Sequence, residues 1–137
     1  MIDRDVRDLI KAHLDITDED LDNVSPGYSK MLSGASELMT WNIVAEVTDS
    51  EYCMHKCKVG DKLVFSGHAV DPVKSTCPLC LGALAPLIDR VHILWDRIFD
   101  GRDPNESWVR YSQCYDAGLI HGGLGRVIFK VYAEKIA

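Results

Sequence analysis

The chain has 137 residues, of which 47% are hydrophobic and 26% charged, and its formal net charge is −6. This length and composition suit one compact soluble domain. The acidic balance argues against nonspecific nucleic-acid binding, which needs a basic face. No apolar run approaches the roughly 20 residues that span a bilayer, and the acidic start MIDRDVRDL lacks the apolar segment of a secretory signal. We therefore expect a cytoplasmic protein that binds neither nucleic acid nor membrane.

Three helices are expected within the first 40 residues. Apolar side chains recur at helical spacing over residues 2–14 and 28–39, and a short helix is expected over 18–24 between them. Residues 1–24 hold eight acidic residues against three basic ones, which leaves this segment at −5. We interpret residues 1–40 as a helical N-terminal arm with one apolar face, which packs on the rest of the chain or on a partner.

The remaining residues, 41–137, are predicted to form the main domain. A long helical pattern runs from Pro78 to Ile98, and Pro86 within it is expected to kink or split the helix. Four segments have the composition and alternation of strands: 41–47, 62–67, 108–114 and 126–136. The expected fold class is α+β, with a small and mainly antiparallel sheet packed by one long helix and an N-terminal helical extension.

Five cysteines give the chain its clearest chemical signal. Structural disulfides are rare in cytosolic proteins, and an odd number of cysteines excludes complete internal pairing. Thiolates are preferred ligands of zinc and of iron–sulfur clusters, and a short spacer lets two thiolates from one turn reach one metal. Three residues separate the first two cysteines, and two residues separate the next pair. The predicted metal ligands are drawn from Cys53, Cys57, Cys77, Cys80 and Cys114.

The CPLC segment, residues 77–80, permits a second interpretation. It leads into the predicted long helix, whose N-terminus carries partial positive charge that favours a thiolate. A thiol redox protein that uses Cys77 and Cys80 would need no metal. A third possibility is that the cysteines are packed as small hydrophobic side chains. Spacing alone favours metal ligation by Cys53, Cys57, Cys77 and Cys80.

The segments CMHKCKVGDK and STCPLCLGALAPLI, followed by a cysteine before the last strand, resemble a family of short uncharacterised proteins, many from anaerobic microbes. That family has Cys-x3-His-Lys-Val-Gly-Asp, then a Gly-x-Cys-Pro…Ala-Leu-x-Pro stretch, then a cysteine near a closing strand. The resemblance covers roughly residues 41–136. It implies no reaction, but occurrence in anaerobes favours an iron–sulfur cluster slightly over zinc.

The resemblance also implies a ligand set that differs from the one favoured by spacing. Cys53, Cys77 and Cys114 match family cysteines, and Cys57 stands where the family more often has His, another metal ligand. Cys80 stands where the family has Ala. Cys53, Cys57 and Cys77 belong to both sets, so the fourth ligand is either Cys80 or Cys114.

These patterns predict a small zinc or iron–sulfur subunit, or accessory protein, of a larger enzyme that it contacts through the N-terminal arm. A different interpretation is a stand-alone metalloenzyme, in which three cysteines hold a metal with an open position and His55, His68 or His121 supplies acid–base chemistry. The sequence assigns no catalytic residue. The glycine-rich stretch GLIHGGLG is expected to be a hairpin connection rather than an anion-binding loop.

Overall fold

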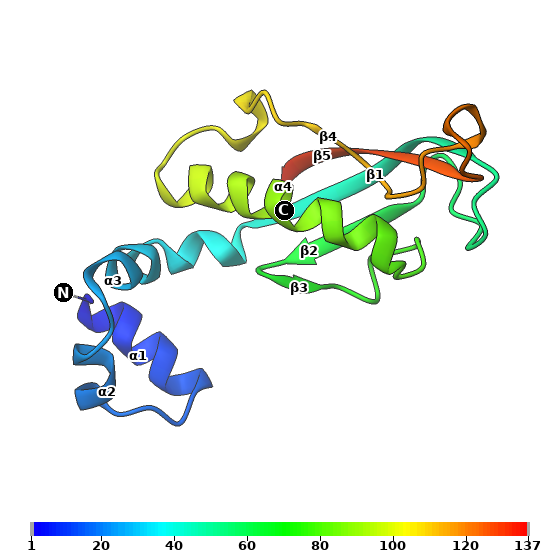
Figure 1. Ribbon diagram of the computed structural model, residues 1–137. Helices are drawn as coiled ribbons and strands as arrows, with labels where there is room; N and C mark the ends of the chain where they lie inside the picture. Colours follow the sequence, from blue (N-terminus) through cyan, green and yellow to red (C-terminus); the bar gives the residue numbers. More distant parts are fainter. Residues whose placement is uncertain (1, 137) are drawn as a thin grey trace.

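The computed structural model describes residues 2–136 and has the predicted α+β architecture, with one antiparallel five-stranded sheet and one long helix packed on it (Figure 1). The sheet order is β3-β2-β1-β5-β4. Its strands are β1 (Trp41–Glu51), β2 (Lys62–Ser66), β3 (Ala69–Val70), β4 (Tyr111–Gln113) and β5 (Arg126–Lys135). The helices are α1 (Arg4–His13), α2 (Asp18–Asp22), α3 (Pro26–Ser33) and α4 (Leu81–Phe99). The 3-10 turns are η1 (Ala35–Met39), η2 (Pro104–Glu106) and η3 (Leu119–His121).

Two predicted elements differ from the structure. α4 is a single helix that continues through Pro86, although a kink or split was expected there. The predicted strand 108–114 is reduced to β4, which pairs only with β5 at the edge of the sheet. Its neighbour Trp108 is 92% exposed, so the apolar and polar alternation of this segment does not correspond to a buried face.

The hydrophobic core lies between α4 and one face of the sheet. Along α4 the buried residues recur at helical spacing: Ala83, Leu87, Val91, Leu94, Trp95 and Ile98. Along the strands every second residue faces them, including Ile43, Ala45 and Val47 of β1 and Val127, Phe129, Val131 and Ala133 of β5. The Trp95 indole N–H donates to the Gly67 carbonyl at 2.9 Å, which ties α4 to the β2–β3 turn. This face therefore fixes the position of α4 on the sheet.

Residues 4–39 contain α1, α2, α3 and η1, and the first strand begins at Trp41. Figure 1 shows α1 and α2 beyond the end of the molecule at which α4 ends. Two contacts join the arm to that end of α4: Lys30 forms an ion pair with Asp100 at 3.6 Å, and Gly34 packs against Phe99. Within the described residues, none of the helices has the length and apolarity to cross a membrane.

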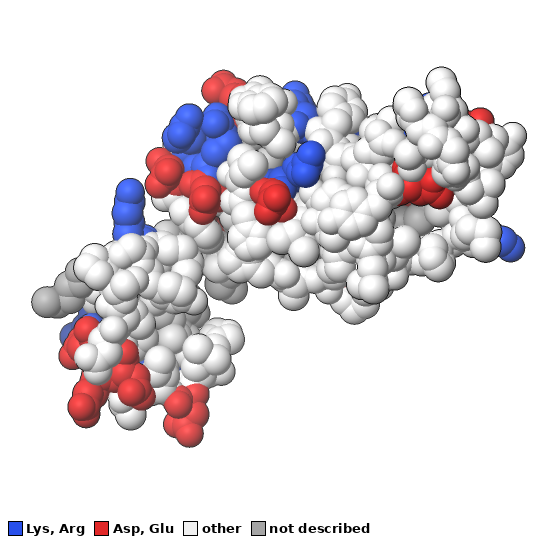
Figure 2. All heavy atoms as spheres, in the orientation of Figure 1, with Lys and Arg blue, Asp and Glu red and all other residues white. Residues whose placement is uncertain are grey.

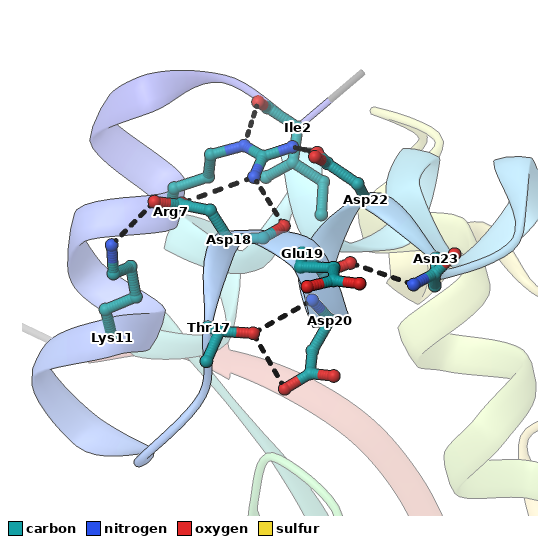
Figure 3. Close-up of polar contacts among 9 residues, drawn as sticks. All are labelled: Ile2, Arg7, Lys11, Thr17, Asp18, Glu19, Asp20, Asp22 and Asn23. Atoms are coloured by element: carbon teal, nitrogen blue, oxygen red, sulfur yellow. Dashed lines mark hydrogen bonds and ion pairs between the residues drawn. The ribbon is translucent and has the colours of Figure 1, made fainter.

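Arg7 connects the helices of the arm (Figure 3). Its guanidinium donates to the Ile2 carbonyl at 3.1 Å and pairs with the carboxylates of Asp18 and Asp22. Lys11 pairs with Asp18 at 2.9 Å, and this contact lowers the pKa of Asp18 below its ordinary value. Part of the acidic surplus is thus paired inside the arm, but these contacts are exposed and each contributes little to stability.

We expect Leu87→Ala to lower the free energy of unfolding by about 2–5 kcal/mol, because it leaves a cavity under α4. Leu87 is fully buried, whereas the adjacent Ile88 is 48% exposed. Ile88→Ala should therefore cost less than about 1 kcal/mol, since little buried area is lost. Urea denaturation of both variants checks this, and equal losses would contradict the described packing of α4.

Candidate functional site

Strand pairing brings the cysteines to one end of the sheet. β1 ends at Glu51, which pairs with Arg126, the first residue of β5. The loop after β1, which holds Cys53, and the loop before β5 therefore leave the sheet side by side. Cys114 follows β4, and its N–H donates to the Val127 carbonyl at 3.0 Å. Cys53 and Cys114 therefore lie at the same end of the sheet although they are 61 positions apart in the sequence.

The other three cysteines lie in the two segments that flank β2 and β3: Cys57 precedes β2, and Cys77 and Cys80 follow β3. The Cys77 N–H donates to the carbonyl of Lys62, the first residue of β2, at 3.0 Å. Cys57 and Cys77 form a disulfide with a Cα–Cα distance of 5.7 Å. Cys80 precedes α4 as its N-terminal cap residue. The CPLC pair is thus divided, since Cys77 is bonded to Cys57 and Cys80 remains free.

A cavity of about 240 Å³ lies among these cysteines. Cys53, Cys57, Cys80 and Cys114 line it, whereas Cys77 is not part of the lining. The other lining residues are Met54, His55, Gly82, Ala83, Tyr115, Asp116, Gly125 and Val127. Cys57 is buried, and the three free cysteines are partly exposed. Four cysteines from three separate segments thus line one largely apolar space.

The loop that carries Cys53 and Cys57 is sharply turned. Tyr52 and Lys56 have positive φ angles of 51° and 58°, a backbone conformation that residues other than glycine rarely adopt. The Lys56 N–H donates to the Cys53 carbonyl at 3.0 Å, and the Ser50 hydroxyl donates to the Cys57 carbonyl. Left-handed residues of this kind cost of order 1 kcal/mol and are concentrated at functional sites. The turn directs both cysteines to the cavity.

Pro86 helps to hold Cys114 at the cavity. Proline has no N–H, so it leaves the carbonyl four residues earlier, that of Gly82, without its helical partner. The Tyr115 N–H donates to this carbonyl at 3.0 Å. The residue next to Cys114 is thus anchored to the first turn of α4, close to Cys80. The sequence indicated an interruption at Pro86 but not the segment that would use the freed carbonyl.

Asp116 organises the glycine-rich loop. Its carboxylate accepts hydrogen bonds from the backbone N–H groups of Gly118, Leu124 and Gly125 at 3.2, 2.9 and 2.7 Å. These bonds, led by that from Leu124, lower the pKa of Asp116 below its ordinary value of 3.8. A Cβ at Gly123 would lie 2.2 Å from the Asp116 Oδ1 atom, so this position has no room for a side chain. The loop is a connection between β4 and β5, as expected, and its inward N–H groups bind a carboxylate of the same chain.

The candidate histidines are dispersed. His55 lines the cavity, whereas His121 belongs to η3 in the glycine-rich loop. His68 stacks on His92 of α4 with ring centroids 4.9 Å apart, and both rings are exposed. The apolar neighbours of His92 in the sequence predict a histidine packed at the edge of the core, and this prediction is wrong because His92 is exposed. Of His55, His68 and His121, only His55 lies where it could act on a group held in the cavity.

The sulfur atoms are gathered but not in the geometry of a single-ion site. Across residues 2–136, no three side chains of His, Cys, Asp or Glu stand where they could hold one metal ion. Ligation by Cys57 or Cys77 would also require the disulfide to be reduced, because a metal binds the thiolate. The two predicted ligand sets share Cys77, which lies just behind the cavity wall through its bond to Cys57.

The segments that carry the cavity-lining residues also hold many exposed apolar side chains, and we call this group the apolar rim. Its members are exposed by between 44% and 85%, although large apolar side chains are usually buried. They are Tyr52, Met54, Val59, Leu79, Leu81, Tyr115, Leu119, Ile120 and Leu124. Figure 2 shows few charged side chains at this end of the molecule, whereas acidic residues gather on the arm at the other end.

Comparisons with known proteins add no relative: no family model matches the chain, and neither a curated protein nor a solved structure shows significant similarity to it. The suspected family therefore stays a prediction from the motifs.

Replacing Asp116 with Asn should destabilise the folded chain at pH 7, because the charged acceptor of three N–H groups is lost. The folded-state pKa is depressed, so the stabilisation by Asp116 is fully present above pH 3.8 and is lost as the pH falls through the lowered pKa. The difference in unfolding free energy between wild type and Asp116→Asn should accordingly shrink in acid. Asp89→Asn, at an exposed position of α4, serves as the control and should change little. A constant difference between pH 7 and pH 2 would contradict this role.

Pro86→Ala should loosen the segment that holds Cys114. The alanine N–H would compete with the Tyr115 N–H for the Gly82 carbonyl, so we expect Tyr115 amide exchange to accelerate roughly fivefold, the equivalent of about 1 kcal/mol. Hydrogen exchange followed by NMR gives this rate, and the amide of the buried Phe129 provides the reference within the same sample. Unchanged exchange at Tyr115 would mean that Pro86 does not position this loop.

Proposed function

We propose that this protein binds an iron–sulfur cluster through Cys53, Cys57, Cys80 and Cys114 and serves in the cytoplasm as a small accessory subunit of a larger enzyme. The observation that carries the proposal is the convergence of these four cysteines, from separate segments, on one cavity. Thiolates are the usual ligands of such clusters. When bound, the cluster would supply one-electron transfer or a Lewis-acid centre.

The size of the cavity favours a cluster over a single zinc ion. A structural zinc site gathers four ligands at about 2.0–2.3 Å from one ion, so its donors are in mutual contact. Here the donors are distributed around a cavity of about 240 Å³, and one water molecule takes about 30 Å³ of liquid volume. Such a space suits a group of several atoms. Zinc remains the alternative, since cysteine thiolates are also its preferred ligands.

The surroundings of the cavity support a redox group rather than a hydrolytic one. Ala83 and Val127 form an apolar part of the cavity wall, which would limit the access of water to a bound cluster. Exposure to water is one of the factors that set the reduction potential of a cluster. Three of the proposed ligands, Cys53, Cys80 and Cys114, are free thiols. His55 also lines the cavity, and a hydrogen bond from its ring to a ligand sulfur atom would adjust the potential as well.

The proposed partner is a larger enzyme subunit. The arm was expected to make this contact, and it exposes Leu14, Tyr28 and Met39. The apolar rim has more exposed large apolar side chains than the arm, and two of them, Met54 and Tyr115, line the cavity. Exposed apolar patches of this kind mark interaction sites. A partner that covered the rim would bring its own redox centre close to the cavity, while the arm would give a second contact at the far end.

A second candidate function, thiol–disulfide exchange, is favoured by one observation. The Cys57–Cys77 disulfide lies beside three free cysteines, and Cys80 caps the N-terminus of α4. A helix N-terminus favours the thiolate, which is the form that attacks a disulfide. This function would need no metal, and it differs from the predicted Cys77–Cys80 pair in using Cys57–Cys77 as the resting disulfide.

Metal analysis of protein purified without oxygen tests the proposal. We expect iron and acid-labile sulfide in about equal amounts, and a broad visible absorption band that is lost in air. Cys53→Ser, Cys80→Ser and Cys114→Ser should each reduce the iron content by at least half, because each removes a ligand. Cys77→Ser is the matched control and should retain iron, since Cys77 is not part of the cavity wall.

Two results would overturn the cluster. About one zinc per chain with no iron would establish the zinc alternative. Absence of both metals from the wild-type protein would leave thiol–disulfide exchange as the function, and a reversible change from five to three titratable thiols on oxidation would then be its signature.

A further inference from the structure

We infer that the Cys57–Cys77 disulfide is a redox gate on the metal site: it withholds Cys57 as a ligand, and its reduction completes the donor set. This inference rests on the proposed function and concerns how the site is regulated. Cys57 is the one cysteine that belongs to both the disulfide and the cavity lining. Its bonding state therefore decides how many thiolates the cavity offers.

The chemical basis is the difference between a thiolate and a disulfide sulfur. A metal is bound by the thiolate, whereas a disulfide sulfur carries no negative charge. With the disulfide formed, the cavity offers Cys53, Cys80 and Cys114 as thiols. With the disulfide reduced, Cys57 becomes a fourth donor in the same cavity. Cys77 is released as well, but it lies outside the lining and is not needed.

The gating step is a complete two-electron exchange with a dithiol reductant. One reductant thiolate attacks the Cys57 or Cys77 sulfur, the S–S bond breaks, and a mixed disulfide forms. The second reductant thiolate then attacks the reductant's own sulfur in this mixed disulfide and displaces the cysteine that is still bonded to it. The products are two protein thiols and one oxidised, disulfide-bonded reductant, so the two electrons and two protons come from the dithiol. The cavity gives the reductant its route to Cys57, which is otherwise buried.

The backbone around Cys57 is held without help from the disulfide. The Ser50 hydroxyl donates to the Cys57 carbonyl, and the Lys58 N–H donates to the Asp61 carboxylate at 3.0 Å. The Gly60 N–H donates to the Val47 carbonyl at 2.9 Å, which closes the same loop onto β1. Cys57 should consequently stay beside the cavity after reduction.

The partner cysteine is held independently too. The Cys77 and Thr76 N–H groups both donate to the Lys62 carbonyl, at 3.0 and 2.8 Å, and the Lys62 N–H donates to the Thr76 hydroxyl at 3.0 Å. The Thr76 hydroxyl in turn donates to the Asp61 carboxylate at 3.3 Å. Both cysteines are therefore fixed to the start of β2, and the bond between them can open and close without rearrangement of the strands.

Cadmium binding tests the gate, because Cd²⁺ is a soft ion whose thiolate charge-transfer absorption increases with each sulfur ligand. Full-length wild-type protein is titrated oxidised, and again after reduction with dithiothreitol and its removal under argon. Cys77→Ser and Cys57→Ser are titrated without reductant. Thiols are counted under denaturing conditions in every sample, and circular dichroism confirms the fold.

We expect at least tenfold tighter Cd²⁺ binding and a larger charge-transfer band for reduced than for oxidised wild type. Oxidised Cys77→Ser should match the reduced wild type, because its Cys57 cannot be withheld. Cys57→Ser should bind as weakly as the oxidised wild type. Cys77→Ala is available if the serine variant does not fold.

The two possible failures are distinguishable. Equal binding by oxidised and reduced wild type, with three and five thiols counted respectively, would overturn the gate and leave the metal site intact. Absence of Cd²⁺ binding by the reduced wild type and by both variants would also overturn the gate, whereas the cluster itself is tested by the metal analysis of protein purified without oxygen.

Discussion

The antiparallel pairing of β1 with β5 is the constraint on which the site depends. The register sets Glu51 opposite Arg126, so the end of β1 and the start of β5 coincide. A bulge at Thr48, where the pairing shifts between Val47 and Asp49, adjusts this register just before the strand ends. A slip of one residue would turn the core-facing side chains to the other face of the sheet. The same register that buries the core therefore also delivers the cysteine-bearing loops to one end.

The long helix contributes to the site in two ways. Its buried stripe fixes it across the sheet, which places its N-terminus, and hence Cys80, at the cysteine end. Pro86 leaves the Gly82 carbonyl without its helical hydrogen bond. The Tyr115 N–H donates to this carbonyl instead, which attaches the Cys114 loop to α4. Core packing thus uses the buried side chains of α4, and site assembly also uses the Gly82 carbonyl of its first turn.

Periodicity predicted the elements well, because β1, β2, β5 and α4 each have one strongly apolar face. The predicted strand 108–114 was longer than β4. An edge strand buries little apolar surface, so the alternation of its side chains is a weak guide to its length. The resemblance and the spacing each proposed four ligands that included Cys77. Neither indicated that Cys80 and Cys114 line the same cavity, because their proximity depends on strand order and on the hydrogen bond at Gly82. The role of Asp116 was also missed, although an Asp close before a glycine-rich loop was an available signal.

The proposal that the cysteine cavity holds a metal cluster is tested most directly by a crystal structure determined without oxygen, with data collected at the iron absorption edge. We expect one strong anomalous peak inside the cavity, within bonding range of Cys53, Cys57, Cys80 and Cys114, with Cys57 and Cys77 separated. An empty cavity bordered by an intact Cys57–Cys77 disulfide, in crystals of protein purified without oxygen in the presence of iron, would contradict it.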